Sequence, residues 1–328
     1  MYDIDGDLLL TSVDDDILKE DIGITTLLHR RLILKAIDEL KKSCSSEFPL
    51  TTATTSNKNK DFSKQFEGDF TPLLPMNEMI LNETYPNVSS CELTEKRHPS
   101  IVSHIHKWVG CLPSGRKIDK IEHVFNSNRY RVFLGQLEAV ENRQYQQAFQ
   151  PNLNNENSRG QRKNVLKRLE VLCQLVKHNR DLPIARMWHG CRKNDLRHIL
   201  SDGFAALSSL DDGYFGKGIY FSSSTKYVTR YCGGKGGCLI MCYILISNPF
   251  PIVTADAPPS VPPERFRFFG KGNHKNYQCH YIPVSPTDDG DEWDFRPPSS
   301  GIIDDAIYDE LVVFQEAYIL PQIVVHLK

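Results

Sequence analysis

The chain has 328 residues and contains no run of about 18 apolar residues, so the sequence predicts no transmembrane helix. It also lacks an excess of charge, because 39 lysine and arginine residues balance 41 aspartate and glutamate residues to a net charge of −2. This balance gives no electrostatic reason to expect a nucleic acid or a membrane as partner. Residues 1–5, MYDID, are acidic where a secretory signal peptide would be basic. We therefore expect an intracellular protein, in the cytoplasm or the nucleus.

The cysteines show no pairing pattern. There are nine of them, an odd number, and none forms a CxxC pair. Cys238 and Cys242 alternate with apolar neighbours in one run, as core thiols do. His274, Cys279 and His280 lie close in sequence but lack the spacing of zinc ligands. The sequence therefore predicts neither a disulfide framework nor a metal site.

The composition divides the chain into three parts. Residues 1–42 carry leucine and isoleucine at helical spacing and predict a small helical segment. Residues 43–99 are rich in Ser, Thr, Asn, Lys and Pro, and bury too little apolar surface to offset the entropy of ordering. They predict a polar linker that is mostly disordered, with any order starting after Phe70. Residues 100–328 carry a dense apolar pattern and predict one folded domain.

The pattern of this domain indicates an α+β fold. Residues 117–124 alternate between apolar and polar and predict a half-exposed strand, whereas 238–246 are apolar on both faces and predict a central strand. Two amphipathic helices and two further strands are expected at 130–140, 166–176, 311–314 and 323–325. Strands outnumber helices after residue 185 without a βαβ repeat, which favours largely antiparallel sheets.

Three blocks place a histidine, a tyrosine and a glutamate on short apolar runs typical of strands. They are WHGCR at 188–192, GKGIYF at 216–221 and YDELVVF at 308–314. Over residues 117–328 these blocks resemble, in the same order, the H-Y-E constellation of poly(ADP-ribose) polymerase-type ADP-ribosyltransferases. The resemblance implies a fold of two packed, largely antiparallel β-sheets with flanking helices. It also implies an enzyme that uses NAD as substrate and transfers ADP-ribose to a protein acceptor.

The resemblance assigns roles to five residues. Cleaving the bond between nicotinamide and its ribose builds positive charge on the anomeric carbon, so the site must hold both groups and present a negative charge. By resemblance, the backbone of Gly190 clamps the nicotinamide amide and His189 binds a ribose hydroxyl. The rings of Tyr220 and Tyr231 stack on nicotinamide. Glu310 is the expected catalytic carboxylate, which stabilises the cation and aids the acceptor.

Other charged residues are secondary candidates. Asp309 and Glu316 compete with Glu310 as carboxylates near the same apolar run, and the family register selects Glu310. Arg192 and Asp195 begin the helix expected after the first block. The resemblance and the field at a helix N-terminus place them near the adenosine ribose or the pyrophosphate of NAD. Arg192 is equally compatible with a solvated charge.

The chain departs from the family at specific positions. Val228 stands where many relatives have a serine that binds the nicotinamide amide, and Thr225 or Thr229 is a candidate replacement. Residues 207–213 form a short loop where the family has its donor loop. Tyr308 stands where arginine-modifying relatives have Glu or Gln, so arginine is not the expected acceptor. No helical bundle precedes the domain, so activation by DNA breaks is not expected.

The N-terminal segment resembles the second half of a sterile alpha motif (SAM) domain. The matching strings are DLL at 7–9, LK at 18–19, GIT at 23–25, HRR at 29–31 and ILKAI at 33–37. The segment lacks the first helices of that domain, and Leu28 stands where the family usually has Gly. The resemblance implies an oligomer or a SAM-domain partner, bound through residues 1–42.

Alternative functions remain open at this point. An NAD glycohydrolase would use water as acceptor, and a catalytically silent module would only bind NAD or ADP-ribose. An RNA 2′-phosphotransferase would need basic residues in place of Glu310. Residues 233–237, GGKGG, predict a hairpin loop because they lack the Ser or Thr of a phosphate loop. Residues 265–271, RFRFFGK, interleave basic and aromatic residues as a surface for single-stranded nucleic acid does. Their flanking prolines favour instead an insertion that covers a sheet edge or shapes the acceptor site. The acceptor and the choice between one ADP-ribose unit and a polymer stay undetermined.

Overall fold

The computed structural model describes residues 34, 79–81, 85–150, 152–204, 212–234, 236–287 and 293–328. The chain divides into two units, Met1–Asn59 and Lys60–Lys328, and every described residue except Leu34 belongs to the second. Apart from Leu34, which is helical, the segment 1–42 and residues 43–78 of the expected linker lie outside the described residues.

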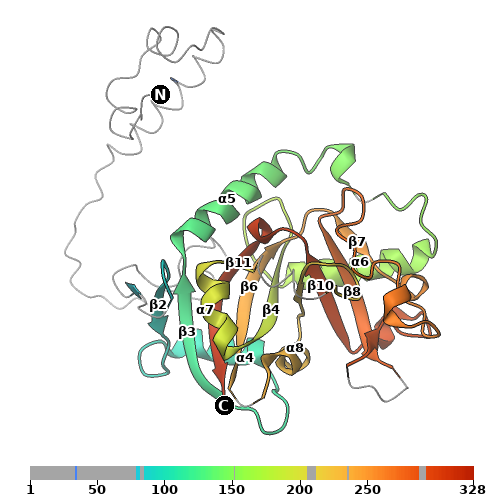
Figure 1. Cartoon of the computed structure of the whole chain (residues 1–328). Helices are drawn as coiled ribbons and strands as arrows, with labels where there is room; N and C mark the ends of the chain where they lie inside the picture. The colour runs from blue at the N-terminus through green and yellow to red at the C-terminus, as the bar shows by residue number, and fades with distance from the viewer. Residues whose placement is uncertain are drawn as a thin grey trace. The chain divides into compact units, whose positions relative to one another are not determined.

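The second unit combines strands and helices in no regular βαβ order (Figure 1). The strands are β1 (Ile80–Leu81), β2 (Ser89–Glu92), β3 (Ile118–Phe125), β4 (Ile184–Arg192), β5 (Ile219–Phe221), β6 (Gly237–Leu245), β7 (Pro249–Pro251), β8 (Cys279–Pro286), β9 (Phe295–Arg296), β10 (Tyr308–Val313) and β11 (Ile319–Leu327). The α-helices are α4 (Pro99–Val109), α5 (Ser127–Glu141), α6 (Arg159–Gln174), α7 (Lys193–Ser201) and α8 (Thr225–Val228). Short 3-10 helices are η3 (Gln147–Phe149), η4 (Thr229–Cys232), η5 (Thr254–Asp256), η6 (Pro263–Arg265), η7 (Ile303–Asp305) and η8 (Glu316–Tyr318).

The strands form two sheets. One has the order β1-β2-β3-β11-β6-β4, and all of its neighbours are antiparallel. The other has the order β5-β10-β8-β7, with β9 beside β8, and its one parallel pair is β7 with β8. The predicted α+β class with two largely antiparallel sheets is confirmed.

The two sheets meet along their edge strands. β4 ends the first sheet and β5 ends the second. Between them lies an isolated antiparallel bridge, in which the Trp188 N–H donates to the Ser222 carbonyl at 2.8 Å and the Ser222 N–H donates to the Trp188 carbonyl at 3.0 Å. This seam joins the segment that carries His189 to the segment that carries Tyr220.

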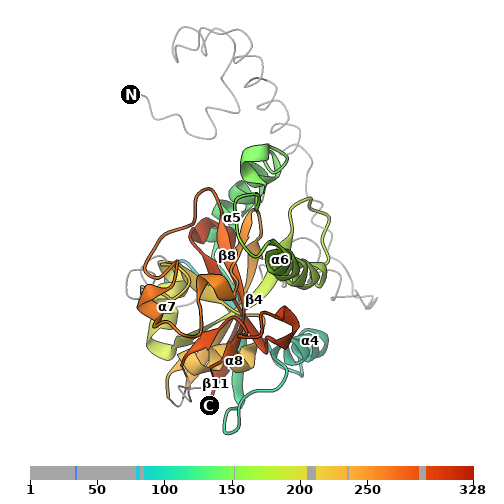
Figure 2. The ribbon, with the colours of Figure 1, turned by 90° about the vertical axis from the view of Figure 1, so that its right-hand side faces the viewer.

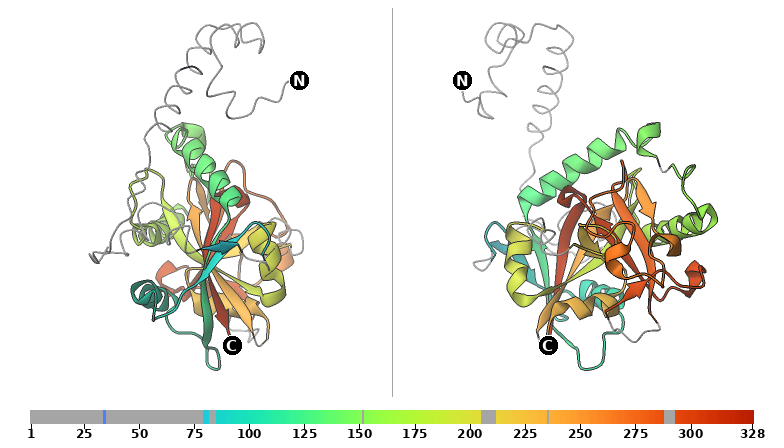
Figure 3. Two further views of the ribbon diagram at one scale, coloured as in Figure 1. Left: turned by 90° about the vertical axis from the view of Figure 1, so that its left-hand side faces the viewer. Right: turned by 45° about the vertical axis from the view of Figure 1, so that its right-hand side comes forward.

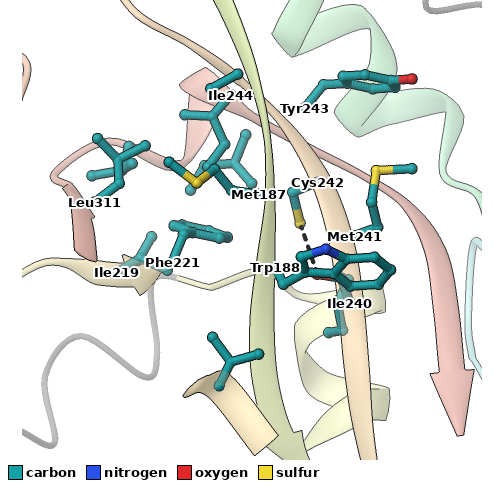
Figure 4. Close-up of a cluster of buried hydrophobic side chains, with 14 of the residues drawn as sticks. Met187, Trp188, Ile219, Phe221, Ile240, Met241, Cys242, Tyr243, Ile244 and Leu311 are labelled. Carbon is teal, nitrogen blue, oxygen red and sulfur yellow. Dashed lines mark hydrogen bonds between the residues drawn. The ribbon is translucent and has the colours of Figure 1, made fainter. Parts of the chain in front are cut away.

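The core lies on both sides of this seam. Every residue of β6 is buried, as its uninterrupted apolar run predicts, and β6 is an inner strand between β11 and β4. Ile219, Phe221 and Leu311 of the second sheet lie on the same side of β4 as Met187 (Figure 4). The apolar packing therefore continues from one sheet to the other.

Helices cover both faces of the first sheet. α7 packs on β4 and β6, and it lies on the side of the sheet opposite to α4 (Figures 2 and 3). α6 packs against β4, β7 and β8 and so touches both sheets. The Asn126 side chain accepts hydrogen bonds from the N–H groups of Asn128 and Arg129, which fixes the start of α5. Among the residues that the structure describes, no helix is long and apolar enough to cross a membrane.

The first sheet begins earlier in the chain than the sequence pattern indicates. β1 and β2 lie within 43–99, the segment expected to be a linker, and β2 pairs with β3 in the register of Ser90 with Val124. The β2 sequence, SSCE, has no apolar alternation. Its strand structure depends on backbone hydrogen bonds to β3, which the sequence pattern does not display.

The basic and aromatic segment 265–271 contributes two residues to the core. Phe266 and Phe268 are buried. Nη1 of Arg267 donates to Glu156 at 2.7 Å and to Asp256 at 2.9 Å. Burial of Phe266 and Phe268 and pairing of Arg267 leave these three side chains unavailable to nucleic acid. The element that precedes β6 in the chain is η4 rather than a strand, so the expected hairpin is wrong.

Candidate active site

A cavity of about 360 Å³ lies where the two sheets diverge. Its described lining residues are His189, Gly190, Gly213, Tyr214, Tyr220, Phe221, Tyr227, Val228, Tyr231, Trp293, Phe295 and Glu310. The five residues expected to hold or activate NAD, which are His189, Gly190, Tyr220, Tyr231 and Glu310, therefore share one cavity. They come from β4, β5, η4 and β10, up to 121 positions apart in the sequence.

The cavity opens where the ladder between β4 and β5 stops. After the bridge of Trp188 with Ser222, the next antiparallel pair would be Gly190 with Tyr220, but no bridge forms there. The N–H and C=O of Trp188 face β5 rather than β6. Backbone groups two residues apart on a strand point the same way, so the N–H and C=O of Gly190 also face away from β6, toward the cavity. A planar carboxamide fits this pair of groups, since it offers one acceptor and one donor.

No side chain fits at position 190. A Cβ atom there would lie 2.1 Å from the Val228 carbonyl oxygen and 3.2 Å from Sγ of Cys232. The backbone of β4 therefore reaches the cavity wall only because the residue is glycine.

His189 is held in one tautomer. Its Nδ1 lies 2.9 Å from the Tyr220 carbonyl oxygen, which can only accept, so Nδ1 carries the proton. Burial lowers the pKa of His189, against the hydrogen bond to Tyr220, which raises it. The ring is therefore neutral near pH 7, and Nε2 has a lone pair that can accept a hydroxyl proton. Phe204 and Phe221 contact the ring edge and fix its orientation.

Tyr220 is fixed through its hydroxyl group. The hydroxyl donates to the Gly216 carbonyl at 2.9 Å and accepts from the Phe215 N–H at 3.0 Å. The phenol therefore holds the turn at Phe215 and Gly216 against β5, and Tyr220 forms part of the cavity wall. Tyr231 lies at the mouth of the cavity, where it is 45% exposed and its ring centre is 6.1 Å from that of Trp293.

Glu310 is a buried carboxylate on β10. It is 7% exposed and lies inside the strand, opposite Ile282, rather than before the strand as its apolar neighbours suggest. The Tyr227 hydroxyl donates a short hydrogen bond to its Oε1 atom. Burial, followed by the negative charge of Glu310, raises the pKa of Tyr227. The phenol therefore keeps its proton for this bond.

The two competing carboxylates lie elsewhere. Asp309 points to the opposite face of β10, because successive side chains of a strand alternate. It accepts from Ser222, Ser223 and Tyr281 at 2.8–3.1 Å. Glu316 pairs with Arg129 at 3.3 Å. Neither lines the cavity, so the geometry singles out Glu310 among the three.

Comparison with known families agrees with this geometry. The family model described as Poly(ADP-ribose) polymerase catalytic domain matches residues 116–328. The chain belongs to this family. Poly(ADP-ribose) polymerase catalytic domains use NAD as substrate and transfer ADP-ribose. The SAM domain (sterile alpha motif) model matches residues 2–41, which indicates protein interaction. No match is found among curated proteins.

Two residues that the resemblance places near NAD lie outside the cavity of this polymerase-family domain. Arg192 precedes the first residue of α7 and is exposed, and Asp195 lies in its first turn. Neither lines the cavity. Arg192 is the last residue of β4 and Asp195 lies in α7, so both follow Gly190 closely in the chain. Of the expected donor loop, 207–213, only Asp212 and Gly213 belong to the described residues.

Neither threonine proposed to replace the family serine faces the cavity. Val228 lines the cavity with an apolar side chain. The Thr225 hydroxyl donates to the Val109 carbonyl at 2.5 Å, and the Thr229 hydroxyl donates to the Thr225 carbonyl at 2.6 Å. Neither threonine lines the cavity. The Thr225 hydroxyl thus joins α8 to the end of α4, and the Thr229 hydroxyl bonds back to α8, so neither is available for the expected amide.

Four aromatic residues of the cavity were not anticipated from the sequence. They are Tyr214, Tyr227, Trp293 and Phe295. Tyr227 is the most consequential, because it contacts Glu310 directly. The string KYVTRY at 226–231 contains two tyrosines four positions apart, a spacing that brings side chains together on a helical turn. That spacing was the available signal. No group of His, Cys, Asp or Glu among the described residues could hold a metal ion.

Proposed function

We propose that this domain transfers ADP-ribose from NAD to an acceptor on protein, with Glu310 as the catalytic carboxylate. One observation carries the proposal: a single cavity brings together a glycine backbone, a neutral histidine, two tyrosine rings and one buried carboxylate. The described lining residues include no lysine, arginine or second carboxylate. Glu310 therefore carries the one formal charge among them.

Each group has a task in the reaction. The N–H and C=O of Gly190 bind the nicotinamide carboxamide, and the rings of Tyr220 and Tyr231 bind the nicotinamide faces. Nε2 of His189 accepts a hydrogen bond from a ribose hydroxyl. These contacts orient the bond that breaks relative to Glu310, which lowers the entropic part of the barrier.

The chemistry requires charge stabilisation at one carbon. The bond from the anomeric carbon to nicotinamide breaks, and its electron pair leaves with nicotinamide. The ribose becomes an oxocarbenium-like cation, which the Glu310 carboxylate stabilises. The acceptor then forms a bond to the anomeric carbon, and its proton is released to water.

Incubation of the purified full chain with NAD labelled in its adenylate group tests the proposal, with Glu310→Gln as the matched variant. We expect label on protein with the wild type and almost none with the variant. A ladder of labelled species would indicate polymer, and a single band would indicate one unit. Free ADP-ribose without labelled protein would replace the transferase by an NAD glycohydrolase. Absence of any NAD consumption would favour a silent binding module.

A further inference from the structure

Tyr227 is locked in place by its backbone and its ring. It lies in α8, where the Ser224 hydroxyl accepts from its N–H at 3.3 Å and caps the helix. Its ring centre lies 4.9 Å from that of Phe295 and 5.1 Å from that of Tyr308. The side chain is 2% exposed. Its hydroxyl group therefore has one position, and that position is against the carboxylate of Glu310.

The hydrogen bonds around Tyr227 have a defined direction. An ionised carboxylate only accepts, so the Tyr227 hydroxyl donates its one proton to Glu310. The Tyr231 hydroxyl lies 3.4 Å from the Tyr227 oxygen, and it must be the donor of that pair. A directed chain thus runs from Tyr231 at the exposed mouth, through Tyr227, to the buried Glu310.

A donor in this position favours one protonation state. A hydrogen bond to a carboxylate stabilises the charged form relative to the protonated acid. In a polarised chain the second hydroxyl strengthens the first bond. The Tyr227 hydroxyl supplies this stabilisation as a neutral donor in direct contact with the carboxylate.

We propose that Tyr227 is a positioning residue that orients the Glu310 carboxylate and keeps it ionised for catalysis. This inference rests on the proposed function of Glu310. It gives Tyr231 a second task, because its hydroxyl polarises Tyr227 in addition to the contact that its ring makes with nicotinamide.

Other titratable and charged groups lie on the elements around Glu310, and their titrations must be distinguished from that of Glu310. They are His189 on β4, Tyr220 on β5, Arg230 and Tyr231 on η4, and Tyr308 and Asp309 on β10. His189 could itself contribute an acidic limb to the activity profile, since burial lowers its pKa. A readout specific to glutamate carboxyls is therefore needed beside the activity.

The test compares the full-length wild type with Tyr227→Phe, which keeps the ring and removes the hydroxyl. The carboxyl carbons of glutamate are labelled with ¹³C, and the Glu310 signal is assigned by its loss in Glu310→Gln. We expect the NMR titration midpoint of Glu310 to rise by about one to two pH units in the variant. The acidic limb of NAD turnover should move by the same amount, with the KM for NAD unchanged. Tyr308→Phe removes a neighbouring hydroxyl that makes no hydrogen bond to Glu310 in the described structure and should leave both midpoints in place.

Coincident Glu310 midpoints in wild type and Tyr227→Phe would overturn the inference and leave Tyr227 a packing residue. If Tyr227→Phe fails to fold, Tyr231→Phe serves instead, because it changes a half-exposed side chain. It should raise the Glu310 titration midpoint by about 0.3 pH units. No rise would again contradict the proposed chain of hydrogen bonds from Tyr231 to Glu310. The NMR titration works without turnover, so loss of the proposed activity and loss of the Tyr227 role are distinguishable.

Discussion

Asp309 and Glu310 are neighbours on β10, yet their surroundings are opposite. Asp309 is 1% exposed and accepts four hydrogen bonds from the serine segment after β5 and from β8. Glu310 faces the cavity and accepts a short bond from Tyr227. The first carboxylate joins three chain segments, and the second faces the space that a substrate would occupy. The alternation of one strand therefore separates a stabilising carboxylate from a reactive one.

Replacing Glu310 should have the largest effect. Glu310→Gln keeps an oxygen that accepts from Tyr227 but removes the charge, so we expect NAD turnover to fall by about 10²–10⁴-fold. NAD affinity and thermal unfolding should change little. Nicotinamide release measures the turnover, and calorimetry with NAD measures the affinity. Turnover within about threefold of the wild type would remove Glu310 from the mechanism.

The same change at Asp309 should act on stability instead. Asp309→Asn places an amide N–H₂ group against the donors of Ser222, Ser223 and Tyr281. Because two donors cannot pair, buried groups lose their partners, and we expect the free energy of unfolding to fall by about 3 kcal/mol. Turnover per folded molecule should stay within about fivefold. Urea denaturation measures the loss. Glu316→Gln is the control, because its partly exposed pair with Arg129 should contribute at most about 1 kcal/mol.

Adding a methyl group at position 190 tests ligand binding, whereas the two carboxylate variants test turnover and stability. Gly190→Ala places Cβ against the Val228 carbonyl, so the wall must move where the carboxamide binds. We expect affinity for a nicotinamide mimic to fall by about 10–100-fold, measured by calorimetry. Gly234→Ala is the control, since no atom lies within 4 Å of a Cβ there. Equal affinities for both variants would argue against the clamp.

The smallest expected effect is a pH dependence of stability away from the cavity. His326 on β11 lies 2.5 Å from Glu122 and 3.5 Å from Cys238. Burial alone would lower its pKa, but hydrogen bonds to Cys238 and Glu122 outweigh burial and raise the pKa of His326 to about 9. Taken alone, this raised pKa stabilises the fold fully below pH 6.5, and the contribution is lost as the pH rises through 9. Hydrogen bonds from Cys191 and His326 lower the pKa of Cys238 to about 5, and that thiolate stabilises the fold increasingly as the pH rises from 5 to 9, so the two contributions oppose each other.

Cys238→Ala removes the opposing thiol, so denaturation of this variant at several pH values measures the His326 contribution, which we expect to be on the order of 1 kcal/mol. Adding His326→Gln should remove the remaining dependence between these pH values while leaving turnover per folded molecule unchanged. A double variant that retains the pH dependence of Cys238→Ala would show that other groups cause it. The comparison then separates titration that controls stability from titration that controls activity.

The sequence predicts those features that local pattern determines. The apolar run of β6 indicates an inner strand, and the order of the three motif blocks identifies the family and the main cavity residues. Residues joined only by long-range contacts are harder to predict. Tyr227 and Glu310 are 83 positions apart, and nothing near either residue signals their hydrogen bond.

Polar segments illustrate the same limit. β2 has the composition of a linker and becomes a strand through the backbone of β3. Arg267 resembles a nucleic-acid contact in sequence, but its charge is paired with Glu156 and Asp256, which lie 111 and 11 positions away. In each case the partner that decides the structure belongs to a distant segment.

The seam between the sheets has a consequence for ligand recognition. A carboxamide bound to the N–H and C=O of Gly190 would occupy the next rung of the ladder after the bridge of Trp188 with Ser222. The ligand would then take the place of one strand residue and form hydrogen bonds between the edge strands β4 and β5. Compounds with a planar amide should therefore slow amide hydrogen exchange at Trp188 and Ser222, whereas equally tight compounds without that amide should not.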